Sequence, residues 1–279
     1  MRCAGPLLLA VTLACGGCDK DSGSGDTSSG ADAARGDPDG GEAGRIWSPA
    51  PGTTWQWQLD GAIDTSFDVA MYDIDLFEAP QETIDALRAD GRIVICYFSA
   101  GSRESYRPDA DDFPGAEVGK PLEGWAGERW LDVRDPTVRA IMETRLDLAV
   151  TKRCDGVEPD NVEAYANPSG FPLTAADQLD FNRFLATAAH QRDLSVGLKN
   201  DVEQAAALEP DFDWSLDEEC VLYDECDGLA PFTGAGKAVF HVEYGAASKA
   251  DTVCPVTGPL GFSTLIKHLA LDAWRVACP

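Results

Sequence analysis

Short apolar runs alternate with longer helical patterns from residue 67 onward, and this alternation predicts the fold. The runs are rich in β-branched and aromatic residues, as buried strands are. There are eight of them, at 68–73, 92–98, 130–133, 156–160, 194–199, 212–216, 238–242 and 261–264. Helical patterns lie between them, including 80–90, 136–152, 174–192 and 264–276. Helices alternating with apolar strands favour a parallel sheet, and eight such units predict an α/β fold that closes into a single (β/α)8 TIM barrel.

The segment 55–59, Trp-Gln-Trp-Gln-Leu, does not fit this alternation. Only eight residues separate it from the next strand run, which is too few for a crossover helix. We interpret the segment as an N-terminal hairpin or plug. The alternative is that it is a barrel strand and that the eighth run is misassigned.

The first 45 residues have a different character from the rest of the chain. Arg2 precedes an apolar run at 7–14 that ends at Cys15-Gly-Gly-Cys18, and this run is far shorter than the ~20 residues that span a bilayer. The pattern predicts a signal peptide over 1–18. A cysteine after small residues resembles a bacterial lipoprotein signal, with Cys15 or Cys18 as the lipidated residue, and the alternative is ordinary cleavage with release.

Residues 19–45 are almost all Gly, Ser, Asp and Ala, which predicts a disordered linker. The remaining residues, 46–279, are enough for one closed barrel domain, which we expect to be a monomer. The expected location is the bacterial cell surface or periplasm, as a lipoprotein, or the medium outside the cell.

Six cysteines fall in the predicted domain: Cys96, Cys154, Cys220, Cys226, Cys254 and Cys278. An even number in an exported chain favours disulfides. Cys220 with Cys226 is the first pair that we expect, and Cys254 with Cys278 is the second. Because Cys96 lies inside an apolar strand run, a buried free thiol is the alternative there.

The chain is strongly acidic, with 48 Asp and Glu against 22 Lys and Arg and a net charge of −26. The linker carries seven acids and three bases, so the predicted domain holds nearly all of the excess. This excess of negative charge repels nucleic acid and anionic membranes and attracts cationic ligands. Nucleic acid is therefore not an expected partner, and contact with a membrane is expected only through the N-terminal lipid.

Acidic and polar residues gather where the strand runs end, which in a TIM barrel is the end that carries the active site. Hydrolysis of a glycosidic bond needs one carboxyl group to protonate the leaving oxygen and a second to act as nucleophile or base. A single acid after a strand is often only a helix cap, and an oxygen-rich rim could also hold calcium or magnesium. The domain lacks an Asp-x-Asp-x-Asp-Gly loop, and we expect no metal or other cofactor.

Several motifs appear together in one order along the chain. They are Trp-Gln-Trp-Gln-Leu at 55–59, Asp-Ile-Asp at 73–75, Cys-Tyr-Phe-Ser-Ala-Gly-Ser at 96–102, Asp-Gly-Val-Glu-Pro-Asp-Asn at 155–161, Leu-Lys-Asn at 198–200, Asp-Glu-Glu-Cys at 217–220 and Glu-Tyr at 243–244. In this combination, residues 47–278 resemble the endo-α-1,4-polygalactosaminidase family of glycoside hydrolases.

The resemblance implies a hydrolase that cuts internal linkages of galactosamine-rich exopolysaccharide with two essential acids, Asp160 and Glu218. We expect a retaining mechanism with Asp160 as nucleophile and Glu218 as general acid/base. Asp217 stands where the family often has Asn, which leaves Glu219 as an alternative to Glu218. The residues expected to bind substrate are Asp73, Asp75, Tyr97, Ser99, Lys199, Asn200, Glu243 and Tyr244.

Partly de-acetylated galactosamine chains are cationic, so an acidic, aromatic groove would bind them through charge-assisted hydrogen bonds and ring stacking. The alternative function is a catalytically inactive, surface-tethered polysaccharide-binding protein on the same barrel.

Overall fold

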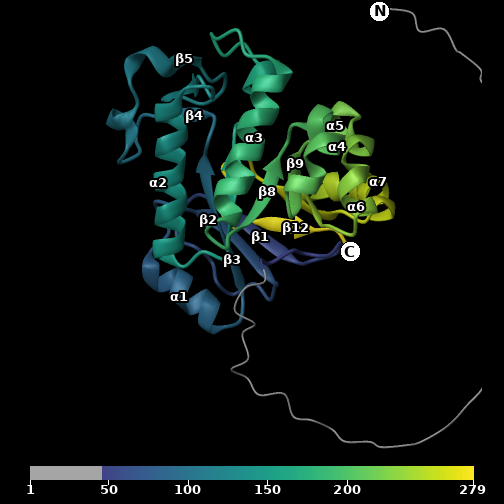
Figure 1. Ribbon diagram of the computed structural model, residues 1–279. Helices are drawn as coiled ribbons and strands as arrows, with labels where there is room; N and C mark the ends of the chain where they lie inside the picture. Colours follow the sequence, from purple (N-terminus) through teal and green to yellow (C-terminus); the bar gives the residue numbers. More distant parts are fainter. Residues whose placement is uncertain (1–45) are drawn as a thin grey trace, which may run out of the picture. The chain divides into compact units, whose positions relative to one another are not determined.

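The computed structural model describes residues 46–279 (Figure 1). The predicted signal segment 1–18 and linker 19–45 lie outside the described residues. Within the described part, no helix combines the length and the apolar character that a bilayer crossing requires.

A nine-stranded sheet, curled into a nearly closed barrel, forms the centre of this part of the chain. Seven successive pairings, from β1 to β11, are parallel, and β12 adds to β11 in the antiparallel direction. In spatial order the strands are β1 (Trp55–Gln58), β2 (Met71–Asp75), β3 (Ile93–Ser99), β7 (Gly156–Asp160), β8 (Ser195–Lys199), β9 (Trp214–Glu218), β10 (Val239–Tyr244), β11 (Ser263–Lys267) and β12 (Arg275–Ala277). The predicted mixed α/β, barrel-like architecture is confirmed.

Two of the predicted strand assignments need correction. The segment at 55–58 is barrel strand β1, which pairs in parallel with β2. The misassigned run is 130–133 rather than the eighth, because it belongs to a separate antiparallel sheet of β4 (Ser102–Glu104), β6 (Glu128–Leu131) and β5 (Val118–Pro121). A run of four residues, three of them apolar, has the same appearance in either kind of sheet, so the pattern alone could not separate the two.

The predicted helix at 264–276 is wrong, because strand β11, a turn and strand β12 occupy these residues. Leu271 adopts a left-handed conformation with φ 52°, which a helix does not accommodate. Its carbonyl oxygen accepts hydrogen bonds from the backbone N–H groups of Leu59 and Asp60. The turn therefore binds the segment after β1, where the two edges of the sheet approach each other.

The helices cover the outside of the sheet, and Figure 1 shows the long α2 and α3 side by side against it. Asp135 caps the first turn of α2, and Thr174 and Asp177 form a capping box on α3, which satisfies N–H groups that a helix start leaves free. The helices are α1 (Gln81–Ala89), α2 (Pro136–Lys152), α3 (Ala175–His190), α4 (Ala205–Leu208), α5 (Cys220–Tyr223), α6 (Ala230–Gly234) and α7 (Ala250–Thr257).

The inside of the barrel changes from apolar to polar along its axis. Large side chains such as Trp55, Trp214 and Phe240 fill the end of the barrel at which the strands begin. Gly197 makes room for them, since a Cβ at this position would lie 2.2 Å from the Trp214 ring. Side chains alternate along a strand, so on β7 the inward positions are Gly156, Glu158 and Asp160, and the polar ones lie toward the carboxyl end.

Three disulfides lie within residues 46–279: Cys96–Cys154, Cys220–Cys226 and Cys254–Cys278. The two predicted pairs are confirmed, and the free-thiol alternative for Cys96 is wrong. Cys96 is on the outer face of β3 and bonds the residue that leads into β7, so this disulfide links two neighbouring barrel strands.

Candidate functional site

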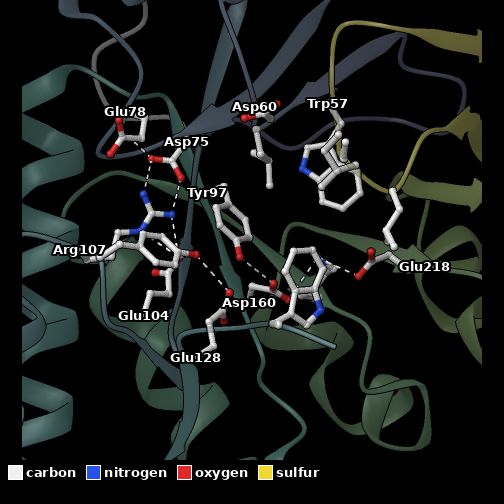
Figure 2. Close-up of a pocket in the computed structure, with 17 residues that line it drawn as sticks. Trp57, Asp60, Asp75, Glu78, Tyr97, Glu104, Arg107, Glu128, Asp160 and Glu218 are labelled. Atoms are coloured by element: carbon white, nitrogen blue, oxygen red, sulfur yellow. Dashed lines mark hydrogen bonds and ion pairs between the residues drawn. The ribbon is translucent and has the colours of Figure 1, made fainter. Parts of the chain in front are cut away.

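A cavity of about 530 Å³ opens at the carboxyl ends of the barrel strands. Figure 2 shows Arg107 between Asp75 and Glu104 at one end of this cavity and Glu218 at the other. Acids dominate the lining, which includes Asp60, Asp75, Glu78, Glu104, Glu128, Asp160 and Glu218. The aromatic residues of the lining are Trp57, Tyr97, Tyr106 and Trp125. The predicted pair Asp160 and Glu218 thus faces one cavity, whereas Glu219 is not among its lining residues.

Sharp turns at the ends of β7, β8 and β9 orient the side chains at the cavity floor. The residue after each of these strands has a positive φ: Asn161 at 61°, Asn200 at 47° and Glu219 at 64°. Asn tolerates this conformation better than most residues do. The turns leave the last side chain of each strand, Asp160, Lys199 and Glu218, directed into the barrel mouth.

The loop after β3 fixes the backbone of Asp160. The N–H groups of Ala100 and Gly101 donate to the Asp160 carbonyl oxygen at 2.8 and 3.1 Å. A Cβ at Gly101 would lie 1.8 Å from the carbonyl oxygen of Asn161. Only glycine permits this close approach, which explains the Ala-Gly-Ser sequence at the end of the strand.

Neutral donors and one cation hold the carboxylate of Asp160. Tyr97 donates its hydroxyl to Oδ2 at 2.9 Å, and the Asn161 backbone N–H donates to Oδ1 at 2.8 Å. Lys199 Nζ lies 3.2 Å from Oδ1. Burial and the charge of Asp160 raise the pKa of Tyr97 well above its ordinary value, so Tyr97 remains a hydroxyl donor.

Glu218 has a matching environment on the opposite side of Lys199. Asn200 donates from Nδ2 to Oε2 at 3.3 Å and accepts the Glu218 backbone N–H at 3.0 Å. Tyr244 donates its hydroxyl to Oε1, and burial followed by the charge of Glu218 raises the pKa of Tyr244. The side chain of Glu218 is 24% exposed and that of Asp160 is 17% exposed, so both carboxylates are open to the cavity.

Lys199 connects the two acids, because its Nζ lies 3.2 Å from Asp160 Oδ1 and 3.2 Å from Glu218 Oε2. These two oxygens are therefore no farther apart than twice that distance. Lys199 is only 1% exposed. Burial acts to lower the pKa of Lys199, but Asp160, Glu158 and Glu218 together raise it well above the ordinary value, which keeps the lysine charged.

The far end of the cavity is organised by Arg107. Its guanidinium donates from Nη1 and Nη2 to both oxygens of Asp75, at 2.9 and 2.5 Å, and from Nε to Glu104 at 2.9 Å. Although burial acts to lower it, the hydrogen bonds to Glu104 and Asp75 raise the pKa of Arg107. Asp75 is thus occupied by a bidentate ion pair of the kind that arginine forms best.

The small antiparallel sheet and its turns form one wall of the cavity. Glu128, at the start of β6, accepts hydrogen bonds from Ser102 at 2.7 Å and Tyr106 at 3.2 Å, and burial raises the pKa of Glu128. Trp125 lies in the turn between β5 and β6, is 47% exposed and lines the cavity. The sequence patterns did not indicate this wall.

Five of the eight residues predicted to bind substrate do not line the cavity, and three of the five have side chains that are buried elsewhere. Asp73 lies inside the barrel beneath it, and Ser99 bonds Ser102 and Asn161. Glu243 accepts the backbone N–H groups of Val221 and Leu222 at the start of α5. Asn200 and Tyr244 instead contact Glu218, and Asp75, Tyr97 and Lys199 line the cavity.

One cluster within residues 46–279 has the spacing of metal ligands, comprising Cys220, Cys226 and His241. Its two sulfur atoms are joined in a disulfide, so they do not offer thiolates to a metal ion.

Comparison with known proteins adds to this geometry. The sequence model of glycoside-hydrolase family GH114 matches residues 39–279. The crystal structure of Aspergillus fumigatus Ega3 in complex with galactosamine is 45% identical and superimposes with a TM-score of 0.81, covering 86% of this chain and 100% of that one.

Two other similarities are more distant. The glycoside hydrolase domain of PelA from Pseudomonas aeruginosa has a TM-score of 0.62 over 80% of this chain and 97% of that one, and at 13% identity it shows likeness of fold alone. An uncharacterized protein of Deinococcus radiodurans is 29% identical over 180 residues, or 56% of this chain. The match spans 57% of the length of that curated relative.

Proposed function

Because the chain belongs to glycoside-hydrolase family GH114, we propose that it cleaves internal α-1,4 linkages of galactosamine-containing exopolysaccharide, with Asp160 and Glu218 as the catalytic carboxylates. The observation that carries the proposal is the pair of acids at 3.2 Å from one shared Lys199 nitrogen on the cavity floor. The likeness to Ega3, whose crystal structure contains galactosamine, supports the choice of sugar.

The proposed mechanism is retaining. Carboxyl groups about 5–5.5 Å apart suit a retaining enzyme, whereas an inverting enzyme needs about 6.5–9.5 Å to admit a water molecule. The Asp160 and Glu218 oxygens that contact Lys199 are separated by at most twice 3.2 Å, a bound that includes the shorter class. Asp160 would attack the anomeric carbon while Glu218 protonates the leaving oxygen, and Glu218 would then activate water to release the sugar.

The acidic cavity suits a cationic polymer. Ammonium groups of de-acetylated residues would be attracted to the excess of carboxylates along the lining, and charge-assisted hydrogen bonds would fix them. Trp125 would supply a face for a sugar ring. We therefore propose that de-acetylated galactosamine is preferred over its acetylated form near the small sheet.

We also propose that residues 46–279 form a closed (β/α)8 barrel that is exported as a monomer, with 1–18 as signal and 19–45 as linker. Trp55 Nε1 donates to the Ser263 carbonyl at 2.8 Å, and Gln56 Nε2 donates to the Ala273 carbonyl at 2.9 Å, which supports closure at the seam. Three disulfides support export, because they persist in oxidising compartments.

The test of the function is a reducing-end assay on purified polymer. Wild-type protein should release new reducing ends from de-acetylated galactosamine polymer and fewer from the fully acetylated form. Binding of the polymer without any new reducing ends would instead identify a polysaccharide-binding protein. Proton NMR of the first product anomer tests retention, since an initial β-anomer would contradict it.

Azide rescue tests the two roles. With an activated α-galactosaminide, Asp160→Ala plus azide should give the β-glycosyl azide, because azide enters the space of the nucleophile. Glu218→Ala plus azide should give the α-glycosyl azide by attack on the covalent intermediate. The reverse pattern would exchange the roles of the two residues.

A further inference from the structure

A third carboxylate contacts Lys199 from below. Glu158 Oε1 lies 2.8 Å from Nζ, closer than either Asp160 or Glu218. Trp57 Nε1 donates to the other oxygen of Glu158 at 3.0 Å, and the Lys199 ammonium lies 4.7 Å from the centre of a Trp57 ring. Glu158 has no exposed surface, so it cannot touch a substrate.

Lys199 by itself would oppose the proposed chemistry. A positive charge at hydrogen-bond distance favours the ionised form of a carboxyl group, and Lys199 lies at that distance from both Asp160 and Glu218. The first step of glycoside cleavage requires one of the two to carry a proton. A lysine without compensation would therefore remove the proton that the leaving group needs.

Glu158 supplies the compensating negative charge, and its neighbour Asp73 supports it. Neither carboxyl oxygen of Asp73 has a donor, and burial together with the charge of Glu158 raises the pKa of Asp73 well above its ordinary value. Glu158 receives Lys199 and the Trp57 N–H. Burial also raises the pKa of Glu158, to about 7, although Lys199 acts to lower it. Of this coupled pair, Asp73 therefore takes up a proton first, and Glu158 is the member that carries the negative charge opposite Lys199.

Building on the function proposed above, we infer that the Glu158–Lys199 ion pair is a positioning unit, which holds Asp160 and Glu218 in place while cancelling the lysine charge, so that the two acids keep one proton between them. Asp73 is a neutral support for this unit. The unit acts from beneath the cavity, and Lys199 is its contact with the reacting groups.

The titratable groups that face Lys199 come from five strands, and three of the six are carboxylates paired with it. They are Asp73 from β2, Tyr97 from β3, Glu158 and Asp160 from β7, Glu218 from β9 and Tyr244 from β10. Both tyrosines and Asp73 are neutral for the reasons given above. Within residues 46–279, Lys199 is the cation that pairs with Asp160 and Glu218, and Glu158 is the buried acid that pairs with Lys199 in turn. Glu163 lies near enough to Asp160, Lys199 and Glu218 to interact with their charges, and burial, followed by the charge of Asp160, raises the pKa of Glu163 to about 8.

The test is the pH profile of kcat on de-acetylated polymer. Glu158→Gln leaves the lysine uncompensated, so the descending alkaline limb should move to lower pH by about one unit. The rate at the wild-type optimum should fall about tenfold, with KM changed by less than about threefold. Lys199→Met should move the same limb to higher pH, which decides the matter if Glu158→Gln does not fold.

Asp73→Asn is the matched control. An amide replaces a neutral acid without changing charge, so the alkaline limb should stay where it is even if the rate falls. A limb that moves as far as in Glu158→Gln would show that Asp73 is charged and would overturn the assignment. An unmoved limb in folded Glu158→Gln or Lys199→Met would overturn it as well.

A titration without substrate separates this inference from the proposed activity. With 13C-labelled glutamate, the Glu218 carboxyl resonance, identified by its loss in Glu218→Gln, should titrate at lower pH in Glu158→Gln than in the wild-type protein. Identical titrations would refute the charge compensation. If the wild-type protein cleaves no polymer, the proposed function fails, and this NMR comparison still decides the role of Glu158.

Discussion

The two ends of the cavity each hold a buried cation among carboxylates, and they differ in how fully the acids are neutralised. Arg107 binds Asp75 with two hydrogen bonds and Glu104 with a third. A second arginine, Arg145, lies 3.8 Å from Glu104 and donates two hydrogen bonds to Asp109, so two cations face three acids.

At the other end, the single ammonium of Lys199 faces three carboxylates, Glu158, Asp160 and Glu218. This surplus of acid means that a proton can be held and exchanged among the carboxylates. In the proposed mechanism, therefore, the acids that react are those whose neighbours leave their charge partly uncompensated.

Replacing one acid by its amide at each end of the cavity should give the largest difference in kcat. Asp160→Asn removes the proposed nucleophile and should lower kcat by about a thousandfold or more. Asp75→Asn changes an acid that Arg107 already neutralises, so kcat should fall by less than about tenfold. Initial rates of reducing-end release, with urea unfolding of each variant as the control for folding, measure the contrast. Equal losses in the two variants would contradict it.

Removing the cation from the arginine end should affect stability first. Arg107→Met leaves Asp75 buried without its cation and takes the closer of two arginines from Glu104. Breaking a buried ion pair in this way costs about 3–5 kcal/mol in the free energy of unfolding. Arg183→Met breaks the half-exposed pair with Asp211 and should cost no more than about 1 kcal/mol. Urea midpoints give both values, and similar costs would mean that the Arg107 pair is not a structural link.

The smallest effects should come from single hydroxyl groups. Tyr97→Phe removes the neutral donor to Asp160 and should lower kcat by about 10- to 100-fold, because a hydrogen bond to a charged group contributes about 1.5–3 kcal/mol. Tyr106→Phe removes the matching donor to Glu104 and Glu128 and should change kcat by less than about threefold. A larger loss in Tyr106→Phe would place the reactive acids at the arginine end.

The carboxylate pair was predictable from sequence because all parallel strands of a barrel end at the same rim. Asp160 and Glu218 close two such strand runs, so the fold class places both at this rim, and the family resemblance selects them from the other acids there. Successive side chains of a strand point alternately into and out of the barrel, and this alternation predicts which acids near a strand end face the cavity. On β10, Val242 belongs to the apolar cluster inside the barrel and Tyr244 contacts Glu218, which leaves Glu243 on the outer face.

The position of a side chain along the barrel axis was harder to predict than whether the side chain points into the barrel. Asp73 and Asp75 share the inward direction, but only Asp75 lines the cavity. The wall that carries Glu104, Trp125 and Glu128 was not predicted, because its strands are three or four residues long and gave no distinct period. The position of Arg107 depends on how residues 102–131 fold over the carboxyl ends of the barrel strands, and the local sequence pattern does not specify this.

The antiparallel sheet of β4, β5 and β6 forms its own hydrogen-bond ladder, apart from that of the barrel. Its strands can therefore lengthen, shorten or exchange residues without disturbing the register that aligns β7, β8 and β9. Substitutions in this sheet can therefore alter contacts to the polymer while β7, β8 and β9 keep the proposed catalytic acids in place. For an engineer, this sheet is the part of the chain in which to begin a library for altered sugar preference.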